Sequence, residues 1–416
     1  MSEINHILKP FQRFGVHLGL TRIKNLLANL GNPQSIVPII HVTGTNGKGS
    51  VCAYLSAVLT EAGYRVGRYT SPHLVDWTER ICLNEQPITT TRLKEALETT
   101  IQAIAPDTET PTQFEVITAA AWLYFAQEKV DVAVIEVGLG GRLDATNVCD
   151  RPLASIITSI SREHWQQLGS TLTAIATEKA GILKTGCPAI LGQLTAEAEA
   201  VVKSRLVELN CPAVWVKAAK PLELEKSWAI YEDITYPLPL LGEIQLLNSA
   251  IAIATFKILQ QQGFQITPSQ IQEGMAKTKW LGRIQWVNWH NYRLLIDGAH
   301  NPAAAIALRN YVDTLKTPIT WVMGMLSTKD HEQILTALLR PGDELYLVPV
   351  RDHSTADPET LQKLGLAICP QLRDCRTFGD LFNALEESLT KTEGLTVLCG
   401  SLYLVGYFLS VSTTNR

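Results

Sequence analysis

Three glycines follow directly on the apolar run IVPIIHV (36–42), in the segment HVTGTNGKGSV, and the helical pattern SVCAYLSAVLTEAG overlaps its end. Glycines allow backbone amides to turn inward around an anion, and the start of a helix attracts negative charge. Among the glycines, Lys48 adds a mobile cation and Ser50 a hydroxyl for a phosphate oxygen or Mg²⁺. The segment therefore predicts a strand, a loop that binds a polyphosphate, and a helix.

This loop is shorter than the usual P-loop pattern, which reads G-x-x-x-x-G-K-[ST]. Val42 stands where the pattern has its first glycine, and Gly49 stands where it has a hydroxyl. Gly44 and Ser50 supply those groups from shifted positions. A plain glycine-rich turn is the alternative, but a lysine and a serine among glycines after a buried strand favour phosphate binding.

Apolar runs typical of buried parallel strands alternate with helical patterns through most of the remaining sequence. The runs VDVAVIEVG (130–138) and PLASIITSI (152–160) extend a first series, and a second series begins near RLLIDGAH (293–300). The tryptophan-rich segment KTKWLGRIQWVNWHNY (277–292) lacks a strong period. We therefore place a linker in that segment.

The length of 416 residues exceeds one ordinary hydrophobic core and suits two domains. We expect an α/β protein whose residues 1–284 form a doubly wound, P-loop-type ATPase domain. Residues 285–416 are expected to form a smaller Rossmann-like α/β domain. Ligand sites are expected at the carboxyl ends of the strands and between the domains.

Charge and cysteine content exclude several classes of partner. The 36 basic and 40 acidic residues show no run of like charge, which argues against a nucleic-acid or anionic membrane surface. Eight cysteines occur without a C-x-x-C pair, so neither a zinc site nor a disulfide framework is expected. The segment MSEINHILKPFQRFG has no cationic head before an apolar stretch, and no run reaches about 18 apolar residues. We expect a cytoplasmic protein without a membrane span.

Polar side chains stand at the ends of several predicted strands. Glu136 closes the run VDVAVIE, His164 follows PLASIITSI, and Asp297 with His300 follows the strand that begins the second series. Carboxyl ends of parallel strands meet at one edge of a sheet, and a carboxylate there can hold Mg²⁺. A salt bridge for Glu136, a surface position for His164 and a turn capped by Asn301 are the alternatives.

Lys179, in ATEKAGILKTG, has a plain structural interpretation on local grounds. A cation in the last turn of a helix, ahead of Gly181 as the C-cap, offsets the helix dipole.

Taken in order, these segments resemble the folylpolyglutamate synthase and dihydrofolate synthase family, a branch of the Mur ligase superfamily. The resemblance spans most of the chain, and several separate motifs in the right order are far more specific than any one. The matching segments are HVTGTNGKGSV, TSPHLVDWTERI (70–81), TQFEVITAAAW (112–122), EVGLGGRLDATN (136–147), EHWQQLGSTLTAIATEKAGI (163–182), LLNSAIAIA (246–254), WLGR (280–283), DGAHNP (297–302) and GSLYLVG (400–406).

The resemblance implies the site residues, position by position. ATP would be bound by Gly44, Thr45, Asn46, Gly47, Lys48, Gly49, Ser50, Asn248, Arg283 and Asp297. Two Mg²⁺ ions would be held by Ser50, Ser71, Glu136, His164 and Lys179, with Lys179 carrying a carbamate formed from CO₂. Dihydropteroate, folates and L-glutamate would contact Arg80, Phe114, Arg142, Leu143, Asp144, Ala145, His300 and Ser401. Catalysis would rest on Lys48, Glu136, His164, Lys179, Arg283 and His300.

The implied activity is ATP-dependent addition of L-glutamate, through an acyl phosphate, by a monomeric enzyme. The segment GGRLDATN resembles the version found in enzymes that act on both dihydropteroate and folates. A folylpolyglutamate synthase alone is the nearest alternative, and a nucleotide-binding switch protein is a more distant one. A Mur ligase of peptidoglycan synthesis normally adds an N-terminal domain, which the position of the loop at residue 44 disfavours.

The sequence also departs from the family pattern in three places. Glu163 stands where Asp is usual before His164, Leu281 stands where Pro is usual, and Thr328 stands where Asp is usual before Lys329. None of these departures removes an implied metal ligand or phosphate contact.

Overall fold

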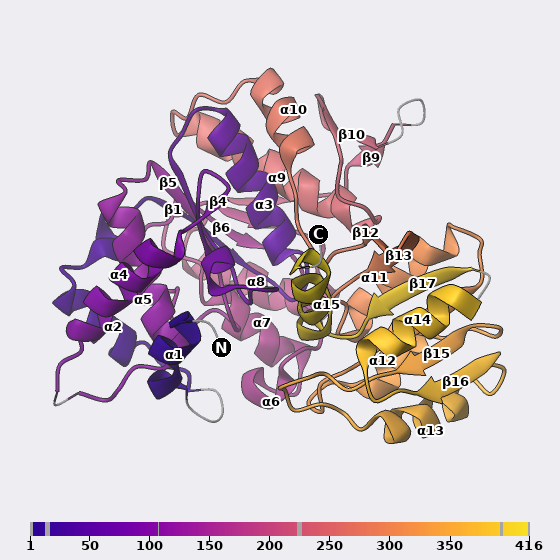
Figure 1. Ribbon diagram of the computed structural model, residues 1–416. Helices are drawn as coiled ribbons and strands as arrows, with labels where there is room; N and C mark the ends of the chain where they lie inside the picture. The colour runs from indigo at the N-terminus through magenta and orange to yellow at the C-terminus, as the bar shows by residue number, and fades with distance from the viewer. Residues whose placement is uncertain (1–2, 13–16, 107, 223–226, 392–393, 415–416) are drawn as a thin grey trace. The chain divides into compact units, whose positions relative to one another are not determined.

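The computed structural model describes residues 3–12, 17–106, 108–222, 227–391 and 394–414 (Figure 1). Contacts divide the chain into two compact units. The first unit comprises Met1–Pro239 and Gln245–Lys279, and the second comprises Leu240–Ile244 and Trp280–Arg416. The expected boundary at 284/285 lies shortly beyond the division at 279/280. In the N-terminal segment MSEINHILKPFQRFG, which was searched for an export signal, residues 1–2 and 13–15 lie outside the described residues.

The first unit is built on an eight-stranded sheet in the order β4-β3-β2-β5-β1-β6-β7-β8. The strands β2, β5, β1, β6, β7 and β8 are parallel, and β3 and β4 run antiparallel at one edge. The strands are β1 Ile39–Thr43, β2 Val66–Tyr69, β3 Ile81–Leu83, β4 Gln86–Pro87, β5 Val132–Glu136, β6 Ala154–Ile157, β7 Ala189–Leu191 and β8 Ala213–Trp215. A three-stranded antiparallel sheet, which the sequence analysis did not predict, adds β9 Lys220–Pro221, β10 Trp228–Tyr231 and β11 Ile234–Pro237.

Strand β1 lies between β5 and β6. Val42 pairs with Glu136 on β5, and Thr43 pairs with Ile157 on β6. The chain leaves β1 toward β2 and β5 and only later places β6 on the other side. The strand order therefore reverses at β1, and in open parallel sheets ligands bind outside the carboxyl ends at such a point.

Helices connect these strands. Those of the first unit are α1 Glu3–Leu8, α2 Thr21–Asn29, α3 Lys48–Glu61, α4 Thr90–Gln102, α5 Gln113–Gln127, α6 Trp165–Leu168, α7 Leu172–Ala180, α8 Ala196–Glu208, α9 Ile244–Gln261 and α10 Pro268–Lys277. Single 3₁₀ turns are η1 Lys9–Phe11, η2 Pro33–Ser35 and η3 Trp77–Arg80. Helix α9 begins one residue before the first unit resumes at Gln245.

Helix α3, which follows the glycine loop, is buried on nearly every side of its first three turns rather than on one face. Helix α10 packs against α3 (Figure 1), and Gly274 makes this possible because a Cβ atom there would overlap the Val58 backbone.

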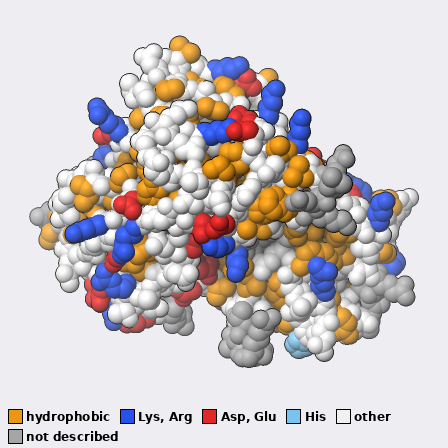
Figure 2. Space-filling view, turned by 90° about the horizontal axis from the view of Figure 1, so that it is seen from above, with side chains coloured by type: hydrophobic (Ala, Val, Ile, Leu, Met, Phe, Trp, Pro, Cys, Tyr) orange, Lys and Arg blue, Asp and Glu red, His pale blue; other side chains and the backbone are white. Residues whose placement is uncertain are grey.

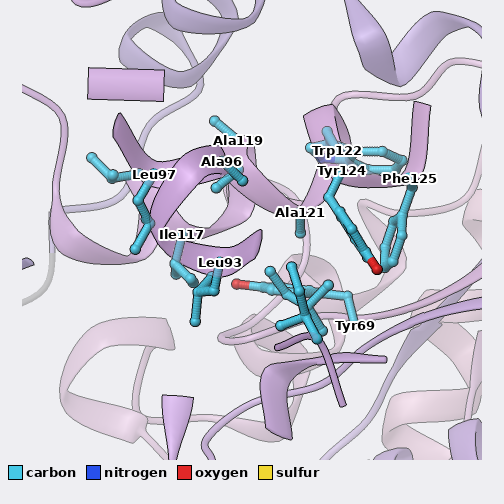
Figure 3. Close-up of a cluster of buried hydrophobic side chains, with 14 of the residues drawn as sticks. Tyr69, Leu93, Ala96, Leu97, Ile117, Ala119, Ala121, Trp122, Tyr124 and Phe125 are labelled. Atoms are coloured by element: carbon cyan, nitrogen blue, oxygen red, sulfur yellow. The ribbon is translucent and has the colours of Figure 1, made fainter. Parts of the chain in front are cut away.

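A hydrophobic cluster joins the sheet of the first unit to α4 and α5 (Figure 3). Its members include Tyr69 of β2, Leu93 and Leu97 of α4, and Trp122 and Phe125 of α5. Each of these side chains is nearly or fully buried. Burial of one such side chain stabilises a fold by about 1.5–3 kcal/mol, so this cluster fixes the strand that leads to residue 71.

The second unit has a six-stranded sheet in the order β12-β13-β17-β14-β15-β16, parallel except for β12. Its strands are β12 Gln285–Trp289, β13 Tyr292–Ile296, β14 Ile319–Met323, β15 Glu344–Leu347, β16 Asp374–Thr377 and β17 Leu395–Cys399. Its helices are α11 Pro302–Asp313, α12 His331–Leu338, α13 Pro358–Ile368, α14 Leu381–Lys391 and α15 Leu402–Thr414. Both units thus have the α/β architecture that the sequence predicts.

The linker predicted at 277–292 is wrong for its second half. Strand β12 pairs antiparallel with β13 through a tight turn, in which His290 and Asn291 have φ of 46° and 69°. Two residues in the left-handed region match the twist of a two-residue hairpin. The aromatic and β-branched residues of QWVNW were a strand signal, but its polar and apolar residues do not alternate.

Surface charge is mixed on the face drawn in Figure 2, where Lys and Arg side chains lie beside Asp and Glu rather than gathering by sign. Among the described residues, none of the helices has the length and apolar character needed to cross a membrane.

We predict that Gly274→Ala lowers the free energy of unfolding by about 1–3 kcal/mol, because the added methyl group overpacks the contact between α10 and α3. Urea denaturation followed by circular dichroism measures the change. The neighbouring exposed change Glu273→Ala is the control and is expected to stay within about 0.5 kcal/mol. Equal effects of the two changes would contradict the close contact.

Candidate active site

The glycine loop joins β1 to α3 and begins at Gly44. A Cβ atom at Gly44 would overlap Thr158 Oγ1, and one at Gly47 would overlap Asn248 Oδ1. Gly47 also has φ of 88°, a left-handed conformation that favours glycine. Both glycines are therefore required by close approach of neighbouring segments.

Polar groups that follow β6 hold this loop. Thr45 donates its backbone N–H to the Ser159 carbonyl at 2.8 Å, and Asn46 donates its own to Ser159 Oγ at 3.0 Å. Thr158 Oγ1 donates to the Asn46 carbonyl at 2.6 Å, and the Ser161 N–H donates to Thr45 Oγ1 at 3.0 Å. The sequence analysis missed these three anchors, although a run of hydroxyl residues after a buried strand was the available signal.

Two lysine ammonium groups converge on the carbonyl of Gly44. Lys48 Nζ donates to this oxygen at 3.0 Å and to the Thr45 carbonyl at 3.1 Å, and Lys179 Nζ donates to Gly44 at 2.7 Å. Lys179 is only 5% exposed. Burial, followed by the positive charge of Lys48, lowers the pKa of Lys179 to about 7. Near neutral pH this side chain is therefore balanced between ammonium and amine.

Helix α9 adds two buried amides next to the start of α3. Gln245 Nε2 donates to Ser50 Oγ at 3.3 Å, and Asn248 Nδ2 donates to Gln245 Oε1 at 3.1 Å. Asn248 also packs against Gly47. The structure thus places the predicted residues Ser50 and Asn248 together, through Gln245, which the sequence analysis did not select.

Glu136 ends β5, as predicted, and is buried beside the end of β1. Its Oε2 accepts the backbone N–H of Ser71 at 3.1 Å, which brings two predicted metal ligands into contact. His164 precedes α6 in the left-handed region, with φ of 50°, and its side chain is 44% exposed. Its Nε2 lies 4.0 Å from Glu163 Oε1.

A second loop, residues 138–147, is organised by a buried carboxylate. Asp144 accepts the backbone N–H of Leu139 at 2.8 Å and that of Thr146 at 3.0 Å, and it accepts the Thr146 hydroxyl at 2.6 Å. Burial raises the pKa of Asp144. Ala145 belongs to the hydrophobic core, whereas Leu143 is half-buried. Asp144 therefore shapes the loop from within, and its predicted contact with substrate stays a prediction.

Loop 138–147 also packs tightly on the end of α7, the helix that carries Lys179. Arg142 Nη2 donates to Glu178 Oε1 at 2.8 Å, and the exposed Arg142 side chain pairs with this carboxylate. Asn147 Nδ2 donates to the carbonyls of Arg142 and Gly181, each at 3.1 Å. Gly181 is the C-cap of α7, as predicted, and a Cβ atom there would overlap Arg142. The loop and the lysine are thus parts of one packed assembly.

Arg80 and Phe114 flank the same region of the first unit. The Arg80 guanidinium lies 4.3 Å from the centroid of the Trp77 ring and donates Nε to His73 Nδ1 at 2.9 Å. Burial, then the charge of Arg80, lowers the pKa of His73 to about 3, so this imidazole is a neutral acceptor. Phe114 covers Gly138, where a Cβ atom would overlap the ring.

In the second unit, Asp297 follows β13 and ties two backbone segments together. Its Oδ2 accepts the N–H of Ile284 at 2.7 Å, and its Oδ1 accepts that of Ala299 at 2.7 Å. Burial raises the pKa of Asp297, and the charge of Arg283 opposes this. Arg283 Nη1 donates to the Gly282 carbonyl at 3.1 Å and lies close to Gly298. Asp297 therefore positions the segment that carries Arg283.

The remaining predicted residues of the second unit lie beside this segment or begin α15. His300 Nδ1 donates to the Gly298 carbonyl at 2.7 Å. Asn301 caps α11 by accepting the Ala304 N–H at 2.9 Å, so the capping alternative is confirmed for this residue. Ser401 is buried, and its Oγ accepts the Tyr403 N–H at 3.2 Å at the start of α15.

Comparison with known proteins shows the family to which the chain belongs. The family model of the Mur ligase middle domain matches residues 42–256, and that of the dihydrofolate synthetase C-terminal domain matches residues 282–411. The folylpolyglutamate synthase of Lacticaseibacillus casei is 37% identical over 405 residues, which covers 92% of this chain and 92% of that protein. The chain belongs to the folylpolyglutamate synthase and dihydrofolate synthase family.

Members of this family are ATP-dependent ligases. The dihydrofolate synthase/folylpolyglutamate synthase of Escherichia coli is 32% identical over 422 residues, covering 96% of this chain and 93% of the relative. A solved structure of E. coli FolC in complex with DHPP and ADP has a TM-score of 0.84 and 28% identity, and covers 99% of this chain and 97% of that chain. The likeness extends over both units of the ligase.

The first unit of this ligase brings together most of the residues predicted for phosphate and metal binding. Hydrogen bonds or close packing link the loop, Lys48, Lys179, Ser50 and Asn248, and Glu136 with Ser71 lies at the neighbouring strand end.

We predict that Ser159→Ala weakens nucleotide binding about tenfold, because the half-buried Asn46 amide loses the Ser159 Oγ acceptor, and loss of such a partner costs about 1–3 kcal/mol. Isothermal titration with ADP measures the dissociation constant. Ser170→Ala, an exposed serine outside the loop contacts, is the matched control. Unchanged affinity in Ser159→Ala would show that the loop holds its shape without this anchor.

Proposed function

We propose that this ligase adds L-glutamate to dihydropteroate, forming dihydrofolate, and to the γ-carboxyl of folates, forming polyglutamates. One observation carries the proposal: the phosphate loop and loop 138–147 are held by the same strand. Thr43, the last residue of β1, donates Oγ1 to the Gly140 carbonyl at 2.7 Å, and the next residue begins the phosphate loop. A nucleotide and a carboxylate-bearing acceptor would therefore meet at one edge of one sheet.

The reaction has two balanced halves. An oxygen of the acceptor carboxylate attacks the γ-phosphorus of ATP, and the bond to the bridging oxygen breaks, which gives an acyl phosphate and ADP. The amine of L-glutamate then attacks the acyl carbon, forms the amide, and loses a proton as inorganic phosphate leaves. Negative charge gathers at the transfer point in both halves, so cationic and N–H donors must stabilise it.

This chain supplies those donors from named places. Lys48 and the amides of the loop that begins at Gly44 would hold the phosphates, with Asn248 beside them. Arg80, Phe114 and loop 138–147 would bind the acceptor. From the second unit, Arg283 would contact the phosphates, and Asp297 would hold the segment that carries Arg283. His300 and Ser401 would bind the reacting groups and L-glutamate.

The first unit supplies part of the set of oxygen ligands that a hard divalent cation such as Mg²⁺ requires. Glu136 is one buried carboxylate, and the Ser50 and Ser71 hydroxyls are neutral oxygen ligands. Within the described ranges, no cluster of three or more His, Cys, Asp or Glu side chains could hold a metal unaided. We propose that Ser50, Ser71, Glu136 and His164 bind Mg²⁺ with the help of the phosphates. Bound Mg²⁺ would neutralise charge on the phosphate oxygens.

A carbamate on Lys179 would supply the missing anionic ligand. Only the uncharged amine reacts with CO₂, and burial beside Lys48 favours that form. The product carries a negative charge where the ammonium carried a positive one. The proposal for Lys179 thus has support from its burial and from its contact with the phosphate loop.

Paired assays test the proposed function. Purified enzyme with ATP, Mg²⁺ and L-glutamate is expected to release ADP with dihydropteroate and, separately, with a reduced folate as acceptor. Activity with the folate alone would establish the second candidate, a folylpolyglutamate synthase, which the name of the L. casei relative favours. ADP release that needs neither acceptor nor glutamate would overturn both and indicate a nucleotide switch.

We predict that Lys48→Ala lowers kcat by about 10²–10³, the usual cost of removing one donor to transition-state charge. Steady-state ADP release measures the rate. Lys203→Ala removes a lysine from an exposed position on α8 and is the control. Near-normal turnover in Lys48→Ala would contradict the proposed role of this lysine in stabilising phosphate charge.

For Lys179 we predict that wild-type enzyme incubated with ¹³C-labelled bicarbonate and Mg²⁺ shows one carbamate resonance by ¹³C NMR that Lys179→Ala lacks. The Lys203→Ala protein is the control, because it removes an exposed lysine on α8, retains Lys179 and Lys48, and is expected to keep the resonance. A spectrum without a difference between wild type and Lys179→Ala would contradict the carbamate.

A further inference from the structure

His41 lies in the middle of β1, the strand that leads to the phosphate loop, and is 1% exposed. It has no role in the proposed chemistry. Its Nε2 lies 2.9 Å from Thr146 Oγ1, in loop 138–147. Burial, then the charge of Lys184, lowers the pKa of His41 to about 3, so the imidazole is neutral.

The hydrogen bonds beyond Thr146 fix the direction of this contact. Thr146 Oγ1 lies 2.6 Å from Asp144 Oδ1, and a hydroxyl has one proton to give. A carboxylate can only accept, so Thr146 donates to Asp144 and must accept from His41. His41 therefore carries its proton on Nε2. His41 thus donates to Thr146, and Thr146 donates to Asp144.

A second link runs parallel to this chain. Thr43 stands two places along β1 from His41, and alternate residues of a strand face the same side. Thr43 Oγ1 donates to the Gly140 carbonyl at 2.7 Å. Loop 138–147 is therefore attached to β1 at two points, near its start through Gly140 and near its end through Thr146.

We propose that His41 is a positioning residue for the acceptor substrate, which sets loop 138–147 relative to the phosphate loop by donating through Thr146 to Asp144. This inference rests on the proposed function, because it takes loop 138–147 to bind the acceptor. The link controls where the acceptor carboxylate lies and leaves the nucleotide site unchanged. Loss of the Nε2 donor would shift the loop while β1 and Gly44 stay in place.

The test compares two substitutions of similar volume. His41→Gln keeps an N–H donor near the position of Nε2, and His41→Met removes it. We expect His41→Met to raise KM for dihydropteroate about tenfold, the effect of one net hydrogen bond to a charged network, with KM for ATP unchanged. His41→Gln is expected to restore most of the acceptor KM. Thermal melting of both variants reports stability separately.

A double-mutant cycle decides whether the effect passes through Thr146. Thr146→Val removes the hydroxyl, and Thr146→Ser keeps it as the control. Changes that act through one chain are non-additive, so His41→Met combined with Thr146→Val is expected to raise the acceptor KM little beyond either change alone. Thr146→Ser is expected to raise the acceptor KM less than Thr146→Val does.

The outcomes separate this inference from the proposed function. Wild-type enzyme without acceptor-dependent turnover would overturn the proposed function itself. An active wild type with equal acceptor KM in His41→Met would overturn the positioning role. Parallel rises in KM for ATP and for acceptor, or equal defects in His41→Gln and His41→Met, would show a general packing role and overturn it as well. If neither His41 variant folds, Thr146→Val and Asp144→Asn are compared instead. Additive effects of these two changes on the acceptor KM would overturn the proposed hydrogen-bond chain.

Discussion

The parallel register of β5, β1 and β6 is the constraint on which the site depends. It sets Val42 opposite Glu136 and Thr43 opposite Ile157, so three strand ends reach one edge together. Each loop that follows must satisfy backbone groups that the sheet no longer pairs. The loops do this largely through one another, and polar residues just past the strands become neighbours. The convergence of the phosphate loop with Glu136 follows from this register.

Hydrogen bonds to backbone groups, more than ion pairs, hold these loops in place. Ser159 Oγ accepts the backbone N–H of Asn46, and Asp144 accepts that of Leu139. Asn147 Nδ2 donates to two backbone carbonyls of neighbouring segments. Such bonds fix a loop without exposing charge to competing water. Glycines at the crossing points allow the segments to approach closely enough for the bonds to form. A site built this way is shaped before its ligands arrive, which reduces the cost of ordering on binding.

Sequence reasoning predicted what periodicity and strand-end position encode. It predicted the strand, loop and helix around Gly44, the place of Glu136 and the C-cap at Gly181. It missed Ser159 and Gln245, because their roles depend on which segments meet in space and no local pattern records that. Strand β12, Gln285–Trp289, was misread as part of the linker, since its polar and apolar residues do not alternate.

The helix dipole alone is too weak to offset the burial of Lys179, although this residue does lie in the last turn of α7. A cation in the last turn of a helix gains about 0.3–1 kcal/mol from the dipole. Lowering its pKa from 10.5 to about 7 reflects a far larger penalty, since each pKa unit corresponds to about 1.4 kcal/mol. An exposed lysine one turn along would obtain the same gain without burial and without repulsion from Lys48. The dipole therefore does not account for the burial of this lysine against Gly44, and that burial supports the reactive amine that we propose.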